Sequence, residues 1–381
     1  MRIAYIFNHK SFFGSHYLPI ANEVKKKNEI KLFCGKDASK TMEKYYRNKI
    51  RNSKINISEF NIHPTKLSFF SDICNFYYFL LEVKKFKPDT IHCATPKGIL
   101  IGGLISFFLK IKSLVIFNTG MGFLFSNKLD FLDEVAKFFY IFFLKNIILK
   151  HKNKAVIVEN INDKKFFNKN MSVKKNNIYL INGSGVDLNK FKNKYSINRK
   201  LVILPSRVIK EKGVIEFCEA AKLLKKDFCD WNYMVVGALD YSKKSKINND
   251  QLKYFSKDLG INFLGFKKNI LKYLKMAGII CLPSYREGLS KVLLEASALG
   301  IPIVTSNVTG CRDAIIPGKT GLLCKVKNYK SLYFKLKRLM IDAELRKTFS
   351  KNGIALAKEK YDINNVIKSN IFIYNKLNKQ K

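Results

Sequence analysis

Residues 281–300 read CLPSYREGLSKVLLEASALG, and this stretch decides how the rest of the chain is interpreted. The apolar run 279–283 predicts a buried parallel strand. Residues 291–299 predict a helix that ends at Gly300, with Pro302 just beyond. The loop between them leads into a helix N-terminus, where the first N–H groups have no helical partner and the helix dipole favours negative charge. The stretch therefore predicts an anion site.

Two carboxylates flank this predicted site. Glu287 lies in the loop before the helix, and Glu295 lies inside the helix. Eight residues of helix span roughly 12 Å, and less with a loop at the start. A diphosphate at the helix N-terminus could therefore place a sugar near Glu287 and a ribose near Glu295, since carboxylates accept hydrogen bonds from hydroxyl pairs. Spacing alone leaves an alternative open, in which Glu287 is a solvated loop residue and Glu295 an exposed helix residue.

The composition indicates a two-domain protein with real hydrophobic cores. The chain has 381 residues, is 47% hydrophobic and carries a formal net charge of +41. Three explanations of that charge compete: nucleic acid, an anionic membrane surface, or a proteome rich in lysine. We find no basic-aromatic RNA-binding signature, zinc-finger spacing or helix-turn-helix pattern, so we favour a membrane surface and compositional bias over nucleic acid.

Cysteine usage and the N-terminal residues indicate a cytoplasmic protein. The eight cysteines show no CxxC spacing and mostly lie in apolar segments, which is typical of reduced, buried thiols. The apolar run 2–7 is too short for a signal peptide or a membrane span.

A longer segment around the opening stretch resembles a known family. Residues 283–315, PSYREGLSKVLLEASALGIPIVTSNVTGCRDAI, resemble the Glu-x7-Glu segment of the retaining nucleotide-sugar glycosyltransferases of family four. Ser290 stands where proline is usual in that family. The resemblance implies an α/β protein of GT-B architecture, with two Rossmann-like domains facing across a cleft. We expect an N-terminal acceptor domain over 1–188, a C-terminal nucleotide-sugar domain over 199–360, and a last helix, 361–381, that crosses back to the first domain.

The resemblance also implies a donor site in the second domain. The predicted strand 201–205 runs into a loop with Arg207 and Lys212, which resemble the family's Arg-x4-Lys pair on the donor diphosphate. Fixed cations there would stabilise the charge of the leaving nucleoside diphosphate. Glu287 would bind sugar hydroxyls and Glu295 the ribose. The remaining donor residues would be Gly288, Leu289, Ser290 and Lys291 at the phosphate and the Gly265-Phe266 turn at the base.

The acceptor is expected at the first domain. After a strand at 2–7, we expect a loop over 8–19 and a helix over 19–27. In that loop, Ser15-His16-Tyr17-Leu18-Pro19 resembles the S-H-R-L-P stretch of the subgroup that builds polysaccharides and lipid-linked oligosaccharides, with tyrosine replacing arginine. His16 could contact substrate or simply pack, and Lys97 could bind an acceptor diphosphate or be a solvated helix-entry lysine. The other predicted acceptor residues are Gly14, Gly120 and Gly122, the last two in a turn that would let backbone approach a substrate.

Residues 130–154 are rich in phenylalanine and end in lysines. The uncharged run 138–144 is far shorter than the roughly 20 residues that a membrane span needs. The segment is therefore either a core helix or an interfacial helix on anionic lipid.

Taken as implied by the resemblance, the function is retaining transfer of a sugar from a UDP-sugar to a polyprenyl-diphosphate-linked saccharide. N-acetylhexosamine is the first expectation for the sugar and hexose the second. The enzyme would assemble O-antigen, capsule or an N-glycan precursor, peripherally bound to the inner face of the cytoplasmic membrane. No Asp-x-Asp occurs, so no metal is expected, and no nucleic acid is expected as a partner. The rival interpretations are a UDP-sugar epimerase or hydrolase of the same fold and a basic nucleic-acid-binding protein.

Overall fold

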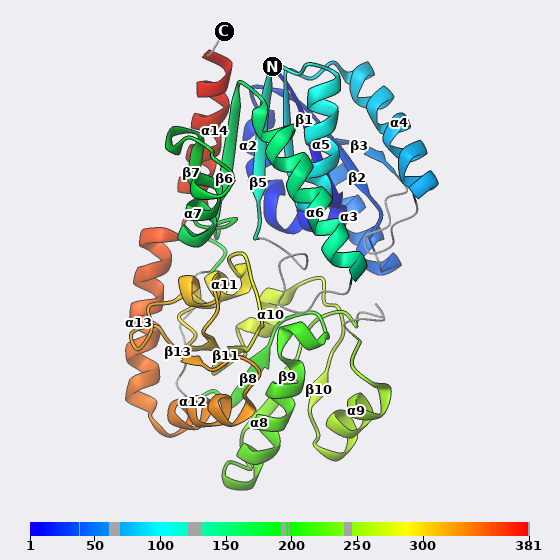
Figure 1. Ribbon diagram of the computed structural model, residues 1–381. Coiled ribbons are helices and arrows are strands. Elements are labelled where there is room, and N and C mark those ends of the chain that lie inside the picture. Colours follow the sequence, from blue (N-terminus) through cyan, green and yellow to red (C-terminus); the bar gives the residue numbers. More distant parts are fainter. Residues whose placement is uncertain are drawn as a thin grey trace. The chain divides into compact units, whose positions relative to one another are not determined.

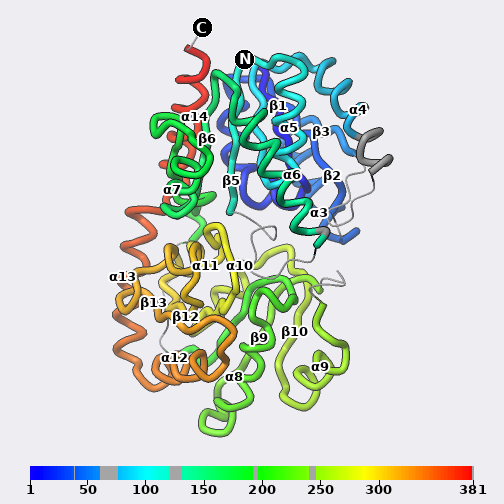
Figure 2. Tube along the Cα trace, viewed as in Figure 1, coloured from blue at the N-terminus to red at the C-terminus, as the bar shows by residue number. Residues whose placement is uncertain are grey.

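The computed structural model describes residues 1–37, 39–60, 69–120, 131–191, 196, 198–239 and 246–379, with backbone alone at 69–75 and 132 (Figures 1 and 2). The chain divides into two compact units. Unit 1 comprises Met1–Ser184 together with Asn365–Lys381, and unit 2 comprises Gly185–Asn364.

Unit 1 is built on a seven-stranded parallel sheet with the order β3-β2-β1-β4-β5-β6-β7. The strands are β1 (Arg2–His9), β2 (Glu29–Gly35), β3 (Asn56–Glu59), β4 (Thr90–Ala94), β5 (Ser113–Asn118), β6 (Lys154–Val158) and β7 (Ile178–Leu180). Alternate side chains of β1 enter different cores: Tyr5 and Phe7 lie on one face, and Ala4 and Ile6 on the other. Both faces are therefore covered, as parallel sheets require.

The helices of unit 1 form one layer on each face of that sheet (Figure 1). The first layer contains α1 (Lys10–Phe12), the π-helical turn η1 (Phe13–Tyr17), α2 (Leu18–Lys25), α3 (Lys40–Asn52) and α14 (Ile363–Lys379). The second layer contains α4 (Phe69–Phe86), α5 (Pro96–Phe108), α6 (Phe131–Asn146) and α7 (Ile161–Lys169). Two short 3-10 turns, η3 (Ile148–Lys150) and η4 (Lys175–Asn177), precede β6 and β7.

Unit 2 repeats this design with a six-stranded parallel sheet of order β10-β9-β8-β11-β12-β13. The strands are β8 (Leu201–Leu204), β9 (Asn232–Val235), β10 (Asn262–Phe263), β11 (Ile279–Leu282), β12 (Ile303–Ser306) and β13 (Gly321–Cys324). The α-helices are α8 (Val214–Asp227), α9 (Asn249–Lys253), α10 (Ile270–Leu274), α11 (Lys291–Ala298), α12 (Tyr329–Ile341) and α13 (Ala343–Lys360). The short turns are η5 (Lys210–Lys212), η6 (Tyr254–Asp258) and η7 (Arg312–Ala314).

Each sheet has one point at which the strand order reverses. In unit 1 the reversal lies between β1 and β4, and in unit 2 it lies between β8 and β11. Open α/β sheets bind ligands outside the carboxyl ends of the strands at such a point. The loops after β8 and β11 are therefore the first place to look for a site in unit 2.

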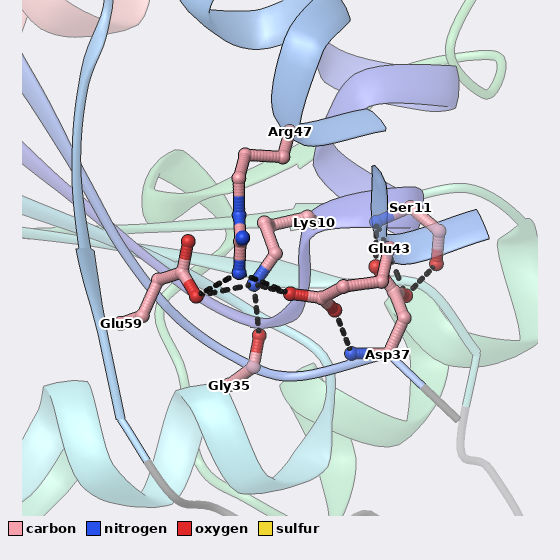
Figure 3. Close-up of polar contacts among 7 residues, drawn as sticks. All are labelled: Lys10, Ser11, Gly35, Asp37, Glu43, Arg47 and Glu59. Atoms are coloured by element: carbon pink, nitrogen blue, oxygen red, sulfur yellow. Dashed lines mark hydrogen bonds and ion pairs between the residues drawn. The ribbon is translucent and has the colours of Figure 1, made fainter. Parts of the chain in front are cut away.

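The expected loop over 8–19 is wrong. Lys10–Tyr17 continues directly from β1 as α1 and η1. Lys10 is fully buried, with its Nζ 2.7 Å from Glu43 Oε1 and 3.3 Å from Glu59 Oε2. Arg47 Nη2 contacts the same two carboxylates at 2.9 and 2.7 Å (Figure 3). This ion cluster ties α1 to α3 and to the end of β3, so the segment is held as helix.

A second buried network joins α14 to β4 and η1. The Tyr374 hydroxyl lies 2.7 Å from His92 Nδ1 and 3.0 Å from the Tyr17 hydroxyl. The Tyr17 hydroxyl also donates to Asn370 Oδ1 at 2.8 Å. Tyr17, which stands where the family has arginine, is therefore a core residue and not a surface phosphate ligand.

Residues 131–146 of the aromatic stretch form α6, which ends well before residue 154. Tyr140 and Leu144 enter the core of unit 1. Phe138, Phe139 and Phe142 are exposed, so the core interpretation is wrong for these three residues. Within the described part of the chain, the helices are all too short or too polar to cross a bilayer.

Candidate functional site

The centre of the candidate site is an ion pair between the loops after β8 and β11. Lys212 Nζ lies 2.5 Å from Glu287 Oε1, although 75 residues separate them in the sequence. Both side chains are mostly buried, at 20% and 13% exposure. The pair therefore lies where the strand order of unit 2 reverses, at the carboxyl ends of the two central strands.

Backbone contacts hold the two loops together. The Glu211 carbonyl accepts hydrogen bonds from the Tyr285 N–H at 2.8 Å and from the Ser284 hydroxyl at 3.1 Å. Gly213, with φ at +71°, lies so close to β11 that a Cβ there would meet the Pro283 carbonyl oxygen at 2.2 Å. These contacts explain why glycine follows Lys212.

A third loop closes onto the same place from the end of β12. Gly310 has φ at +80°, and a Cβ there would lie 2.1 Å from the Gly288 carbonyl oxygen. The Ser306 hydroxyl donates to the Ser284 carbonyl. The loops after β8 and β12 thus hold the backbone of the Glu287–Gly288 loop in place.

The second predicted carboxylate lies on α11. Glu295 is only 6% exposed and pairs with Lys291 one turn earlier. The alternative of an exposed helix residue is therefore wrong. Ser290 precedes the helix as its N-cap residue without a side-chain cap, and both Leu289 and Ser290 are buried.

Arg207 lies in the same loop as Lys212, and its side chain is exposed. The loop after β9 packs against the backbone before Arg207, because a Cβ on Gly237 would meet the Ser206 carbonyl oxygen at 1.8 Å. Gly265 has φ at +66° and open space where its Cβ would be, and Phe266 beside it is partly buried.

The predicted acceptor residues lie in unit 1. His16 stacks on the Phe12 ring, with centroids 4.6 Å apart, and its Nδ1 lies 2.7 Å from the Ser15 hydroxyl. Gly14 is buried against Tyr46, and Lys97 lies in the first turn of α5 after Thr95, whose φ is +68°. Gly120 follows β5 with φ at +95°, whereas Gly122 lies outside the described residues.

Sequence reasoning missed Tyr285 and Glu216. The Tyr285 hydroxyl donates to Glu216 Oε1 at 2.7 Å, which ties the loop after β11 to α8. An aromatic residue two positions before Glu287 was the available signal. Across the ranges that the structure describes, no three His, Cys, Asp or Glu side chains group closely enough to hold a metal ion.

Comparison with known proteins assigns both units to glycosyltransferase families. Residues 186–356 match the family described as glycosyl transferases group 1, and residues 2–154 match the glycosyl transferase 4-like family. The chain is a glycosyltransferase of family four. The Lys212–Glu287 pair lies within residues 186–356, the part of this enzyme that matches the group 1 family.

Two relatives with stated roles span most of this glycosyltransferase. It is 27% identical to the N,N'-diacetylbacillosaminyl-diphospho-undecaprenol α-1,3-N-acetylgalactosaminyltransferase of Campylobacter jejuni, over 99% of each chain. It is 24% identical to the capsular polysaccharide biosynthesis glycosyltransferase CapM of Staphylococcus aureus, over 77% of this chain and 78% of the relative.

Solved structures show the same fold. Anabaena Alr3699/HepE in complex with UDP-glucose superposes with a TM-score of 0.78 at 17% identity, over 99% of each chain. The sucrose-phosphate synthase of Thermosynechococcus elongatus gives 0.76 at 15% identity, over 99% of each chain. The expected α/β fold with two Rossmann-like sheets, of the GT-B class, is confirmed.

Proposed function

We propose that this glycosyltransferase moves a sugar, with N-acetylhexosamine as the leading candidate, from a UDP-sugar to a polyprenyl-diphosphate-linked glycan with retention at the anomeric carbon. The observation that carries the proposal is the Lys212–Glu287 pair at the strand-order reversal of unit 2. The Campylobacter relative, whose name states an N-acetylgalactosaminyl transfer to an undecaprenol-linked sugar, supports this class of donor and acceptor.

In this proposal each donor residue has a separate role. Glu287 accepts hydrogen bonds from the sugar hydroxyls, and Glu295 does the same for the ribose. Lys212 and Arg207 neutralise the diphosphate. The N–H groups from Gly288 to Ser290 add donors at the start of α11, and the Gly265-Phe266 turn faces the base.

The chemical step needs no separate base in this scheme. The bond from the anomeric carbon to the β-phosphate oxygen breaks, and the acceptor oxygen bonds to the same face of that carbon. The leaving phosphate takes the acceptor proton. Negative charge therefore grows on the β-phosphate, where Lys212 and Arg207 would stabilise it more strongly in the transition state than in the ground state.

The acceptor belongs to unit 1 in this proposal. Lys97 at the start of α5 would contact the acceptor diphosphate, and His16 and Gly14 would line its approach together with Gly120. The tyrosine at position 17 contributes to the core only. A polyprenyl-linked acceptor resides in a bilayer, so we also propose that the enzyme works at the anionic inner face of the cytoplasmic membrane.

The test is transfer of radiolabel from UDP-N-acetylgalactosamine, UDP-N-acetylglucosamine and UDP-glucose to a polyprenyl-diphosphate-linked saccharide, with and without EDTA. Glu287→Gln should lower kcat by about 100-fold or more. Asp230→Asn is the matched control. Asp230 also pairs with a lysine in unit 2, but it lies before the amino end of β9, whereas the candidate site lies at the carboxyl ends of the strands. Full activity of Glu287→Gln would refute the site. Release of UDP with no label in the lipid would favour the hydrolase interpretation. Conversion of the UDP-sugar into its epimer would favour the epimerase interpretation.

A further inference from the structure

The outer surface of the second helix layer of unit 1 carries a concentration of exposed aromatic side chains. Its main members lie on three helices, two on each: Tyr77 and Tyr78 on α4, Phe107 and Phe108 on α5, and Phe138 and Phe139 on α6. We call this the aromatic face. Phe131 and Phe142 of α6 are exposed as well. Elsewhere in the described residues, large exposed aromatics occur singly, as at Phe334 and Phe372.

The three helices are neighbours on one side of the sheet (Figures 1 and 2). They precede β4, β5 and β6 in turn, and these strands are adjacent in the sheet. The Phe76 and Phe108 rings meet edge to face at 6.2 Å, which joins α4 to α5. Gly103 of α5 lies directly against Ile148, just after α6. The exposed rings therefore belong to one continuous helix layer, which is unusual for a soluble monomer surface.

Exposed lysines lie in or just after the last turn of each of these helices. They are Lys84 on α4, Lys110 after α5, and Lys145 and Lys150 at and after the end of α6. Helices that connect parallel strands all run opposite to the sheet, so their C-terminal ends gather at one edge. These four lysines form no ion pair with any other described residue. In contrast, the nearby acidic residues Glu82 and Glu134 are already paired, with Lys85 and Lys137.

We infer that the aromatic face docks on an anionic lipid bilayer, with the phenylalanine rings in the interfacial region and the four lysines against the headgroups. Exposed aromatics next to uncompensated lysines bind such surfaces through apolar burial and electrostatic attraction together. A second copy of the chain fits less well, because a symmetric contact would bring the same unpaired lysines together. The inference rests on the proposed function, since it names the surface on which that enzyme meets its lipid-linked acceptor.

The experiment is flotation of the full chain with vesicles of phosphatidylcholine containing 30% phosphatidylglycerol, and with phosphatidylcholine alone. Wild type should float with the anionic vesicles, less so at high salt. Phe138→Ser should weaken binding about tenfold, which corresponds to 1.4 kcal/mol. Replacing Lys110 and Lys145 by glutamine should weaken binding to anionic vesicles only.

Phe372→Ser is the matched control. Phe372 is 59% exposed, compared with 66% for Phe138, and lies in the same unit but on α14, in the other helix layer. It should bind vesicles like wild type. Equal binding by Phe138→Ser and Phe372→Ser would overturn the inference. A wild-type dimer that Phe138→Ser dissociates, with no vesicle binding by either, would assign the face to a second copy and would also overturn it.

UDP binding in the absence of lipid separates this inference from the proposed function. Phe138→Ser should bind UDP as wild type does, because the donor residues lie in unit 2. Lost vesicle binding with intact UDP binding supports the docking face. If the wild-type protein bound vesicles but not UDP, the donor site would be refuted and the docking face would still be supported.

Discussion

Replacing Lys10 by methionine should destabilise unit 1 far more than removing any surface lysine. At an effective dielectric constant of 20, the 2.7 Å and 3.3 Å contacts to Glu43 and Glu59 correspond to gross attractions of about 6 and about 5 kcal/mol. Desolvation of the fully buried ammonium offsets much of this. Removing one partner of a buried ion cluster costs about 3–5 kcal/mol. In Lys10→Met, Arg47 alone would remain to compensate the two carboxylates.

The loss of stability in Lys10→Met should depend on pH, because the ion cluster shifts the pKa values of Glu59 and Lys10. Burial raises the pKa of Glu59, but the Arg47 and Lys10 contacts outweigh burial and hold that pKa below its ordinary value of 4.5. The stabilisation from Glu59 is therefore complete above that value and is lost as the pH falls through the lower folded pKa. Burial lowers the pKa of Lys10, but Cys34, Glu43 and Glu59 together raise it above 10.5, so its contribution is lost only as the pH rises beyond that.

The assay must report on unit 1 alone. Trp231, the single tryptophan, lies in unit 2, so its fluorescence serves as an internal control. Hydrogen exchange of the β1 and β2 amides would report unit 1. Lys112→Met is the matched variant, because Lys112 is 81% exposed and pairs with Asp89 at 3.3 Å in the same unit. Exposed pairs contribute about 0–1 kcal/mol.

Lys10→Met should therefore lower protection of β1 and β2 strongly at pH 7 and less as the pH falls through the lowered pKa of Glu59, where that carboxylate accepts a proton. Equal effects of Lys10→Met and Lys112→Met would refute the reasoning. A cost that does not shrink on acidification would show that the lysine acts through packing of its stem, not through its charge.

Three further outcomes are expected. Glu295→Gln should raise the KM for UDP-sugar about tenfold with a smaller change in kcat, measured by steady-state transfer assays, because it removes a carboxylate assigned to the ribose. Gly310→Ala should weaken UDP binding in calorimetry, since its φ of +80° and a Cβ 2.1 Å from the Gly288 oxygen would displace the donor loop. Burial lowers the pKa of His92 to about 3, so folded unit 1 should lose about 1.4 kcal/mol of stability per pH unit as the pH falls below 6.5. His92→Gln should abolish that slope in urea unfolding followed by circular dichroism.

Hydrophobic periodicity and a glycine stop signal predicted the strand and the helix on either side of the Glu287 loop. The buried strand before residue 283 is β11, and the helix that ends before Gly300 is α11. These predictions held because each depends on neighbours in sequence: a short apolar run, a helical pattern, and a glycine with φ at +69°. The pairing of Lys212 with Glu287 could not be read in this way, because it depends on β8 and β11 being adjacent.

The failure at residues 8–19 has a physical cause. Lys10, Ser11 and His16 are polar and read as a loop, but helix formation there depends on carboxylates from α3 and β3 that neutralise Lys10. In a chain with 70 lysines and arginines, no local signal distinguishes Lys10, which is fully buried, from the exposed basic residues. The same limit applies to α6: its aromatic residues look alike in sequence, and only packing separates Tyr140 in the core from Phe138 on the surface.

Tyr17 shows how a departure from a family pattern can be interpreted physically. An arginine at that position would bring a charge that needs solvent or a phosphate, whereas tyrosine can be buried if its hydroxyl is paired. Here the hydroxyl meets Asn370 and Tyr374 of the returning α14, so the substitution is coupled to residues more than 350 positions away. If the arginine usual at this position in the family contacts a phosphate, another group must make that contact in this enzyme. Lys97, at the start of α5 where the strand order of unit 1 reverses, is the cation that our proposal assigns to it.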